Sequence, residues 1–318
     1  MSILIRKPGI RTAVRDFGRF GHMAAGINPT GAMDTLSARV VNILLGNSDN
    51  AALLEFGFPA PEIEFEADTA FCIGGSAVDA KLNSVPVSLW KPQKASPRDI
   101  LTLSPASNGN FAYLAVAGGF DVPEVLGSRT TNLAAGFGGH QGQLLAPGDR
   151  LSLRSPGQSF PNAQTALGYS LRPQLADPIR IRITRGPEYD RITALSEQTL
   201  TTETFSVGQN SDPMGFRLTG PRMFSLDETE LLSSAATFGT VQLLPDGGLA
   251  VLMSDHQTTG GYPRIAVVAA VDLPLLSQLR PKRPFQFVLI DVSEAEMLLF
   301  EREQELRFLK TGLRLARG

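Results

Sequence analysis

Short apolar runs separated by glycine- and proline-containing turns most limit how this chain can fold. The sequence has 31 glycines and 22 prolines in 318 residues, and the runs between them that are apolar or alternate apolar with polar residues are of strand length, as at 62–66, 70–73 and 112–117. Helices need longer periodic stretches without such breakers, so the pattern favours short strands joined by turns. The sequence therefore predicts a mainly β chain with few short helices.

The length of the chain indicates about two domains of ordinary size. Residues 155–177 are rich in proline and polar residues and are the predicted linker. We expect a first β-rich domain over 1–170 and a second over 177–318. The second begins with isoleucines that alternate with arginines at 179–183, a pattern typical of a half-buried strand.

Two helices have recognisable start signals. Asp34 is a suitable N-cap for a helix near 34–45, which Gly46 would end. Ser293 and Glu296 form a capping box for a C-terminal helix that runs to about residue 310. The first domain is thus predicted to carry one helix and the second to end in one.

Composition excludes several classes of partner. The formal net charge of −2, with both signs interspersed, predicts no nucleic-acid binding. No apolar run is long enough to span a membrane, and the single cysteine, Cys72, indicates a reducing compartment. The three histidines lie far apart, so no metal site is expected. We expect a cytoplasmic protein without a membrane partner.

A polar decapeptide at 255–264 lies between two apolar runs that are predicted to be strands. Its glycines, Gly260 and Gly261, allow positive φ and have no Cβ, so a ligand can approach the backbone N–H groups closely. Two interpretations stay open at this point. The decapeptide is either a ligand site or a hairpin whose Asp and Thr side chains satisfy only their own turn.

Further polar loops surround single arginines. Arg129 lies among glycines and small polar residues at 126–142, and Arg217 and Asn210 lie in a polar loop at 208–220. Guanidinium and backbone N–H groups suit a carboxylate or phosphate, although long barrel connections would look the same. Such groups are poor nucleophiles but stabilise oxyanions, which favours transfer or opening at an activated amide or carbonyl.

Six motifs occur in order along most of the chain. They are Gly-Ala-Met-Asp at 31–34, Ala-Gly-Gly-Phe-Asp-Val-Pro at 117–123, Leu-Gly-Ser-Arg-Thr-Thr-Asn at 126–132, Gly-Phe-Gly-Gly at 136–139, Pro-Gly-Asp at 147–149 and Asp-His-Gln-Thr-Thr-Gly-Gly-Tyr-Pro at 255–263. Together they resemble the family of biotin-dependent carboxyltransferases and 5-oxoprolinase C subunits, also called allophanate hydrolase subunit 2 or KipA-like. The resemblance implies two β-rich domains with cyclophilin-like barrel architecture.

The resemblance also implies a function. A family member belongs to an ATP-dependent 5-oxoprolinase, a hydrolase that opens the cyclic amide 5-oxoproline to L-glutamate with the help of an A-type subunit and a KipI-like B-type subunit. ATP would act through the complex. One alternative is a biotin-dependent carboxyltransferase acting on urea or a related amide, with biotin on a separate carrier. Another is a non-catalytic KipA-like regulator that binds a KipI-like protein.

Site residues follow from the resemblance by position. The implied catalytic residues are Asp255, Gln257, Thr258 and Thr259. The implied substrate-binding residues are Arg129, Asn132, Asn210, Arg217, His256, Gly260, Gly261 and Tyr262. His256 and Pro213 stand where the family usually has arginine, so an altered substrate or a regulatory role is also compatible with the resemblance.

Overall fold

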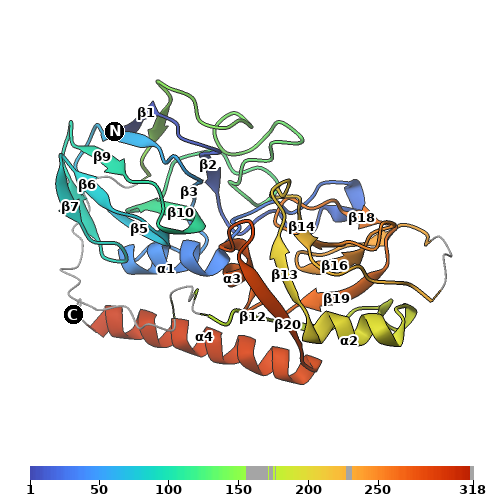
Figure 1. Ribbon diagram of the computed structural model, residues 1–318. Helices are drawn as coiled ribbons and strands as arrows, with labels where there is room; N and C mark the ends of the chain where they lie inside the picture. Colours follow the sequence, from blue (N-terminus) through green and yellow to red (C-terminus); the bar gives the residue numbers. More distant parts are fainter. Residues whose placement is uncertain (155–170, 172–174, 176, 227–230, 316–318) are drawn as a thin grey trace. The chain divides into compact units, whose positions relative to one another are not determined.

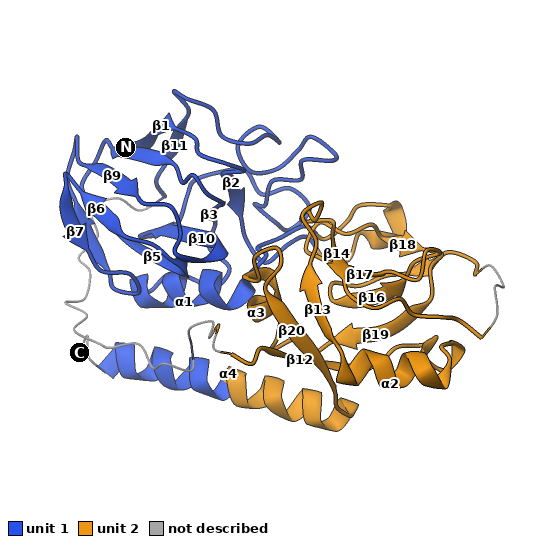
Figure 2. Cartoon of the chain, in the orientation of Figure 1, with its two compact units in different colours: residues 1–19, 30–173, 304–318 blue, residues 20–29, 174–303 orange. Residues whose placement is uncertain are grey.

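The computed structural model describes residues 1–154, 171, 175, 177–226 and 231–315 (Figure 1). The chain divides into two compact units (Figure 2), of which unit 1 comprises residues 1–19, 30–173 and 304–318 and unit 2 comprises 20–29 and 174–303. The predicted linker at 155–177 lies mostly outside the described residues. The prediction of a mainly β chain with few helices and a C-terminal helix is confirmed.

Unit 1 contains two antiparallel sheets. The first has the order β11-β1-β4-β9-β6-β7 and the second β2-β3-β10-β5-β8. The strands of the first are β1 (Ser2–Lys7), β4 (Glu62–Phe65), β6 (Ala80–Leu82), β7 (Val85–Val87), β9 (Ile100–Leu103) and β11 (Arg150–Ser152). Those of the second are β2 (Ala13–Arg15), β3 (Leu53–Phe56), β5 (Thr69–Ala77), β8 (Gln93–Ala95) and β10 (Asn108–Val116).

Strand β5 shows how the second sheet uses both of its faces. Phe71 and Ile73 belong to a core cluster that also contains residues of the first sheet. Ala70 and Cys72 point to the other face, because successive side chains of a strand alternate. There they meet helix α1 (Thr35–Leu45) and residues 306 and 313 of helix α4 (Val292–Leu315). Burial raises the pKa of the Cys72 thiol, so this cysteine is a structural residue.

Unit 2 contains a closed barrel in the order β12-β19-β16-β17-β14-β13-β20. Its strands are β12 (Arg180–Arg185), β13 (Thr204–Val207), β14 (Gly215–Thr219), β16 (Thr240–Leu243), β17 (Leu249–Leu252), β19 (Arg264–Val268) and β20 (Pro284–Leu289). β12 and β20 run parallel and close the ring. Ile181 and Ile183 are fully buried between partly exposed arginines, as the alternation predicted.

Smaller elements accompany the barrel. Helix α2 (Ala194–Thr202) packs on β20, and helix α3 (Leu273–Ser277) follows β19. Strands β15 (Ser234–Ala235) and β18 (Thr259–Gly260) form a separate two-stranded sheet. The C-terminal helix α4 begins after Asp291, whose Oδ1 accepts a hydrogen bond from the N–H of Glu294 at 2.7 Å. The prediction that Ser293 caps this helix is therefore wrong, because Asp291, two residues earlier, accepts the capping hydrogen bond.

Helix α1 begins and ends where its signals predicted. The buried carboxylate of Asp34 accepts hydrogen bonds from Ser37, through Oδ1 from the backbone N–H at 2.8 Å and through Oδ2 from the hydroxyl at 2.5 Å. At the other end Gly46 has φ 78°, and its N–H donates to the carbonyl of Ile43. Left-handed backbone at this position favours glycine.

Replacing the N-cap tests this account of α1. Asp34→Ala removes both acceptors for Ser37 and is expected to lower the free energy of unfolding by about 1–2 kcal/mol, measured by urea denaturation. Asp34→Asn is the matched control, because asparagine keeps an acceptor for the Ser37 N–H. Its free energy of unfolding should fall clearly less than that of Asp34→Ala. Equal losses in the two variants would show that the charge, and not the cap, stabilises the helix.

Candidate functional site

The decapeptide 255–264 joins β17 to β19, and these strands lie on opposite sides of β16 in the barrel. The connection therefore has to cross β16. Within it, Thr259 and Gly260 form β18 and pair with Ala235 and Ser234 of β15. The decapeptide is thus a crossing connection outside the barrel and not a tight hairpin between neighbouring strands.

Asp255 is held at its backbone by two other segments of unit 2. Its N–H donates to the carbonyl oxygen of Pro213 at 2.8 Å. Its own carbonyl oxygen accepts a hydrogen bond from Nδ2 of Asn28 at 2.9 Å. Three parts of the chain that are far apart in sequence meet here, while the Asp255 side chain is half-buried. The start of the decapeptide is consequently fixed in place.

His256 is buried, with 1% of the residue exposed. Its Nδ1 lies 2.6 Å from the carbonyl oxygen of Gln257. A carbonyl only accepts hydrogen bonds, so Nδ1 carries the proton and Nε2 is left as an acceptor. Burial lowers the pKa of His256, although the Gln257 carbonyl and the charge of Asp255 oppose this shift. His256 is therefore a neutral imidazole at neutral pH.

Gly260 lies against two side-chain amides. Neither Gly260 nor Gly261 has positive φ, so the left-handed backbone that the sequence allowed is not used. A Cβ on Gly260 would lie 2.7 Å from Nε2 of Gln242 and 3.6 Å from Nε2 of Gln257. Gln242, a buried residue of β16, was missed in the sequence; the only signal was one glutamine between the apolar residues Val241 and Leu243.

The remaining decapeptide residues differ in exposure. Gln257, Thr258 and Gly261 are half-buried, whereas Thr259 and Tyr262 are exposed. The carbonyl oxygen of Thr258 accepts a hydrogen bond from the N–H of Ala236 at 3.1 Å. The decapeptide therefore offers hydroxyl and carboxamide groups on a segment whose backbone is tied down at several points.

Arg217 and Asn210 lie elsewhere on the same barrel. Arg217 is in β14 opposite Ala250, and its exposed guanidinium is paired with Asp246, in the turn before β17. The decapeptide follows the other end of β17, so this guanidinium is bound at the far end of the strand. Asn210 is exposed in a turn. The structure does not bring Arg217 into contact with the decapeptide.

Arg129 and Asn132 belong to unit 1, whereas the other predicted site residues belong to unit 2. Arg129 donates its backbone N–H to Oδ2 of Asp16 at 2.6 Å and pairs its guanidinium with Glu124 at 2.8 Å. Asn132 is buried, and its Oδ1 accepts the N–H of Ala135 at 3.0 Å. Both side chains therefore have local structural partners.

The glycine-rich loops of unit 1 are organised around Arg19, which sequence analysis did not single out. Its fully buried guanidinium donates to the carbonyl oxygens of Val125 at 2.8 Å and Thr130 at 3.1 Å and lies 4.6 Å from the centre of the Phe137 ring. Burial lowers the pKa of Arg19, partly offset by Asp16. This arginine holds backbone carbonyls, which supports the interpretation of these loops as structural connections.

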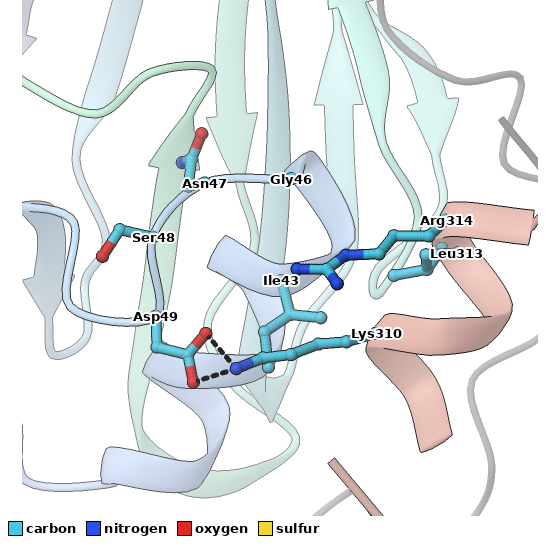
Figure 3. Close-up of a pocket in the computed structure, with 8 residues that line it drawn as sticks. All are labelled: Ile43, Gly46, Asn47, Ser48, Asp49, Lys310, Leu313 and Arg314. Carbon is cyan, nitrogen blue, oxygen red and sulfur yellow. Dashed lines mark hydrogen bonds and ion pairs between the residues drawn. The ribbon is translucent and has the colours of Figure 1, made fainter. Parts of the chain in front are cut away.

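A pocket of about 350 Å³ lies in unit 1 beside the end of α1 (Figure 3). Lys310 of α4 crosses it, with Nζ 2.7 Å from each carboxylate oxygen of Asp49. Burial raises the pKa of the Asp49 carboxyl group, but hydrogen bonds from Lys310 and Arg39 outweigh this effect and hold the pKa below its usual value. Figure 3 shows Arg314 reaching toward the end of α1, where a cation is favourable. The pocket contains none of the predicted site residues.

Metal clusters and membrane-spanning helices are both absent from the described ranges. No group of three or more His, Cys, Asp or Glu side chains in the described part of the chain is arranged to hold a metal ion. None of the helices within these ranges combines the length and the hydrophobicity that a bilayer crossing requires.

Comparison with known proteins places the chain in a family. Residues 25–289 match the family described as carboxyltransferase domain, subdomain A and B. The chain is 38% identical over 313 residues to the 5-oxoprolinase C subunit of Escherichia coli K12, covering 98% of both proteins. It is 35% identical over 298 residues to the protein of the same name from Haemophilus influenzae, covering 92% of this chain and 93% of the relative.

A solved structure agrees with these matches. The crystal structure of Kluyveromyces lactis urea carboxylase is similar over 98% of this chain, with a TM-score of 0.91 and 28% identity, although the match spans only 29% of that longer chain. Three findings therefore point to the same family. They are the match to the domain family, the two relatives matched over almost their whole length, and the shared fold. The chain belongs to the carboxyltransferase domain family, subdomains A and B, and is similar to two relatives named as the C subunit of 5-oxoprolinase.

Proposed function

We propose that this chain is the C subunit of an ATP-dependent 5-oxoprolinase, which opens 5-oxoproline to L-glutamate. The observation that carries the proposal is the full-length similarity to two relatives named as 5-oxoprolinase C subunits. That name implies other subunits, and we propose an A-type subunit and a KipI-like B-type subunit as partners. The sequence has no GxxxxGK[ST] phosphate loop, so ATP is assigned to the complex and not to a site in this chain.

The chemistry of lactam opening suits the decapeptide. The oxygen of water bonds to the ring carbonyl carbon and the water gives up a proton. The carbon–nitrogen bond then breaks, and the ring nitrogen takes up a proton and becomes the amine of glutamate. Negative charge develops on the carbonyl oxygen and needs fixed donors. We assign Asp255 and Gln257 to orienting the ring amide, and the segment Thr258–Gly261, which includes Thr259, to donating hydroxyl and backbone N–H groups to the oxyanion. The anchored backbone of Asp255 supports this assignment.

The substrate carboxylate needs a cation, and within unit 2 we assign this role to Arg217. Its guanidinium is paired with Asp246, and both side chains are more than half exposed. Exposed pairs are weak, so Arg217 can leave Asp246 and turn toward a substrate carboxylate. Asn210, Gly260, Gly261 and Tyr262 are proposed to complete the binding surface in unit 2, whereas the buried His256 acts through its neighbours and not by direct contact.

A carboxyltransferase acting on urea or a related amide is the second candidate. The family description and the urea carboxylase structure favour it. The carboxamide of Gln257 and the hydroxyls of Thr258 and Thr259 are half-buried or exposed donors that suit a ureido carbonyl, so these residues would also fit biotin. Biotin on a separate carrier would supply the carboxyl group, and the decapeptide would hold the acceptor amide.

The regulatory alternative rests on two positions. Pro213 and His256, where the family usually has arginine, lie on either side of the hydrogen bond between the Pro213 carbonyl and the Asp255 N–H. The two missing positive charges therefore belong to one junction. A KipA-like regulator that binds a KipI-like protein without turnover would tolerate this loss.

Turnover separates the three candidates. The chain is purified with its partner subunits, and ATP hydrolysis and glutamate release are followed with 5-oxoproline, and separately with urea plus a biotinylated carrier. We expect glutamate release that requires 5-oxoproline, ATP and all subunits together. ATP use stimulated only by urea and the carrier would support the carboxyltransferase. A stable complex that neither substrate stimulates would support the regulator.

The Arg217–Asp246 pair gives a test of carboxylate binding. If Arg217 must leave Asp246 to bind the substrate, Asp246→Ala should lower the KM for 5-oxoproline roughly two- to fivefold, while Arg217→Ala should raise it roughly tenfold. Asp190→Ala, which removes an exposed carboxylate elsewhere in unit 2, is the control and should change neither value. A KM that is the same in all three variants would exclude Arg217 as the carboxylate ligand.

A further inference from the structure

Gln242 carries a buried amide that the fold itself does not use. The residue lies in β16, beneath the crossing connection, and only 2% of it is exposed. Its Nε2 has no hydrogen-bond partner among the residues that the structure describes. An unpaired buried N–H group destabilises a protein, whereas leucine, of similar size, would carry no such penalty. Stability alone therefore does not account for a glutamine at this position.

A second carboxamide points to the same place. Nε2 of Gln242 and Nε2 of Gln257 both approach the bare α-carbon of Gly260, where a Cβ would lie 2.7 Å and 3.6 Å from them. Gly260 has no positive φ, and the space beside its α-carbon is occupied by the carboxamide of Gln242. Two side-chain amides therefore lie side by side under a backbone position that carries no side chain.

We propose that the side-chain amides of Gln242 and Gln257 together bind the amide group of the substrate, an arrangement called here the carboxamide clamp. Nε2 of Gln242 donates a hydrogen bond to the carbonyl oxygen of the substrate. The inference rests on the proposed function and adds Gln242 to its site. A ring amide has its N–H and C=O on the same side, and a glutamine carboxamide presents a matching donor and acceptor side by side. The clamp therefore favours cyclic amides and ureas over ordinary trans peptide bonds.

Access to the clamp depends on β18. This strand covers Gln242 and pairs with β15 at only two register positions, Ser234 with Gly260 and Ala235 with Thr259. So short a ladder is easily separated, because few contacts hold it. The substrate reaches Gln242 when β18 separates from β15 while the anchored backbone of Asp255 stays in place. When β18 closes again over the bound amide, the buried N–H has the partner that it lacks.

The test combines stability with turnover. Gln242→Leu, in the full chain, should have a Tm equal to or above that of the wild type, because it removes an unpaired buried amide. In the complex with its partner subunits, the same variant should lower kcat/KM for 5-oxoproline roughly tenfold or more, because the substrate carbonyl loses a donor. Gln278→Leu is the matched control: Gln278 is equally buried but has interaction partners, so its loss should lower Tm.

Two results would overturn the clamp. One is a fall in Tm for Gln242→Leu comparable to that of Gln278→Leu, which would make Gln242 a structural residue. The other is a kcat/KM within roughly twofold of the wild type. The Tm comparison does not depend on the substrate, so it decides against the clamp even if the wild-type complex proves inactive on 5-oxoproline. Inactivity of the wild type would count against the proposed function instead.

Discussion

The placement of β16 between β17 and β19 is the constraint on which the candidate site depends. The chain that joins the two outer strands cannot form a tight hairpin and has to cross the strand between them. The crossing covers the outward side chain of Gln242, and it is held at its start by Pro213 and Asn28. A polar segment is thereby fixed over a buried amide, which a solvated hairpin tip would not achieve.

Features that depend on neighbouring residues could be predicted from the sequence. The helix from Asp34 to Gly46, the alternation at 179–183 and the mainly β character follow from local propensity and periodicity, and the structure confirms them. The polar decapeptide was also located correctly between two strands. These signals are local because capping, turns and amphipathic patterns involve residues within a few positions of each other.

Features that depend on distant contacts could not be predicted. Nothing near Arg217 in the sequence indicates that Asp246 pairs with it, and nothing near Arg19 indicates that its guanidinium binds carbonyls more than a hundred positions away. The reason for Gly260 was likewise hidden, because the space it leaves is filled by a side chain from another strand. Only the barrel order reveals that Gln242 lies under the decapeptide.

The central claim is that the crossing segment around Asp255 acts on the substrate. Glutamate release by the assembled subunits, with Asp255→Ala compared with the exposed-surface control Asp190→Ala, tests this claim most directly. The account predicts that Asp255→Ala lowers kcat about a hundredfold or more while Tm and assembly are unchanged, because the orienting carboxylate is lost. Undiminished glutamate release by the Asp255→Ala complex would contradict it and place the chemistry in another subunit.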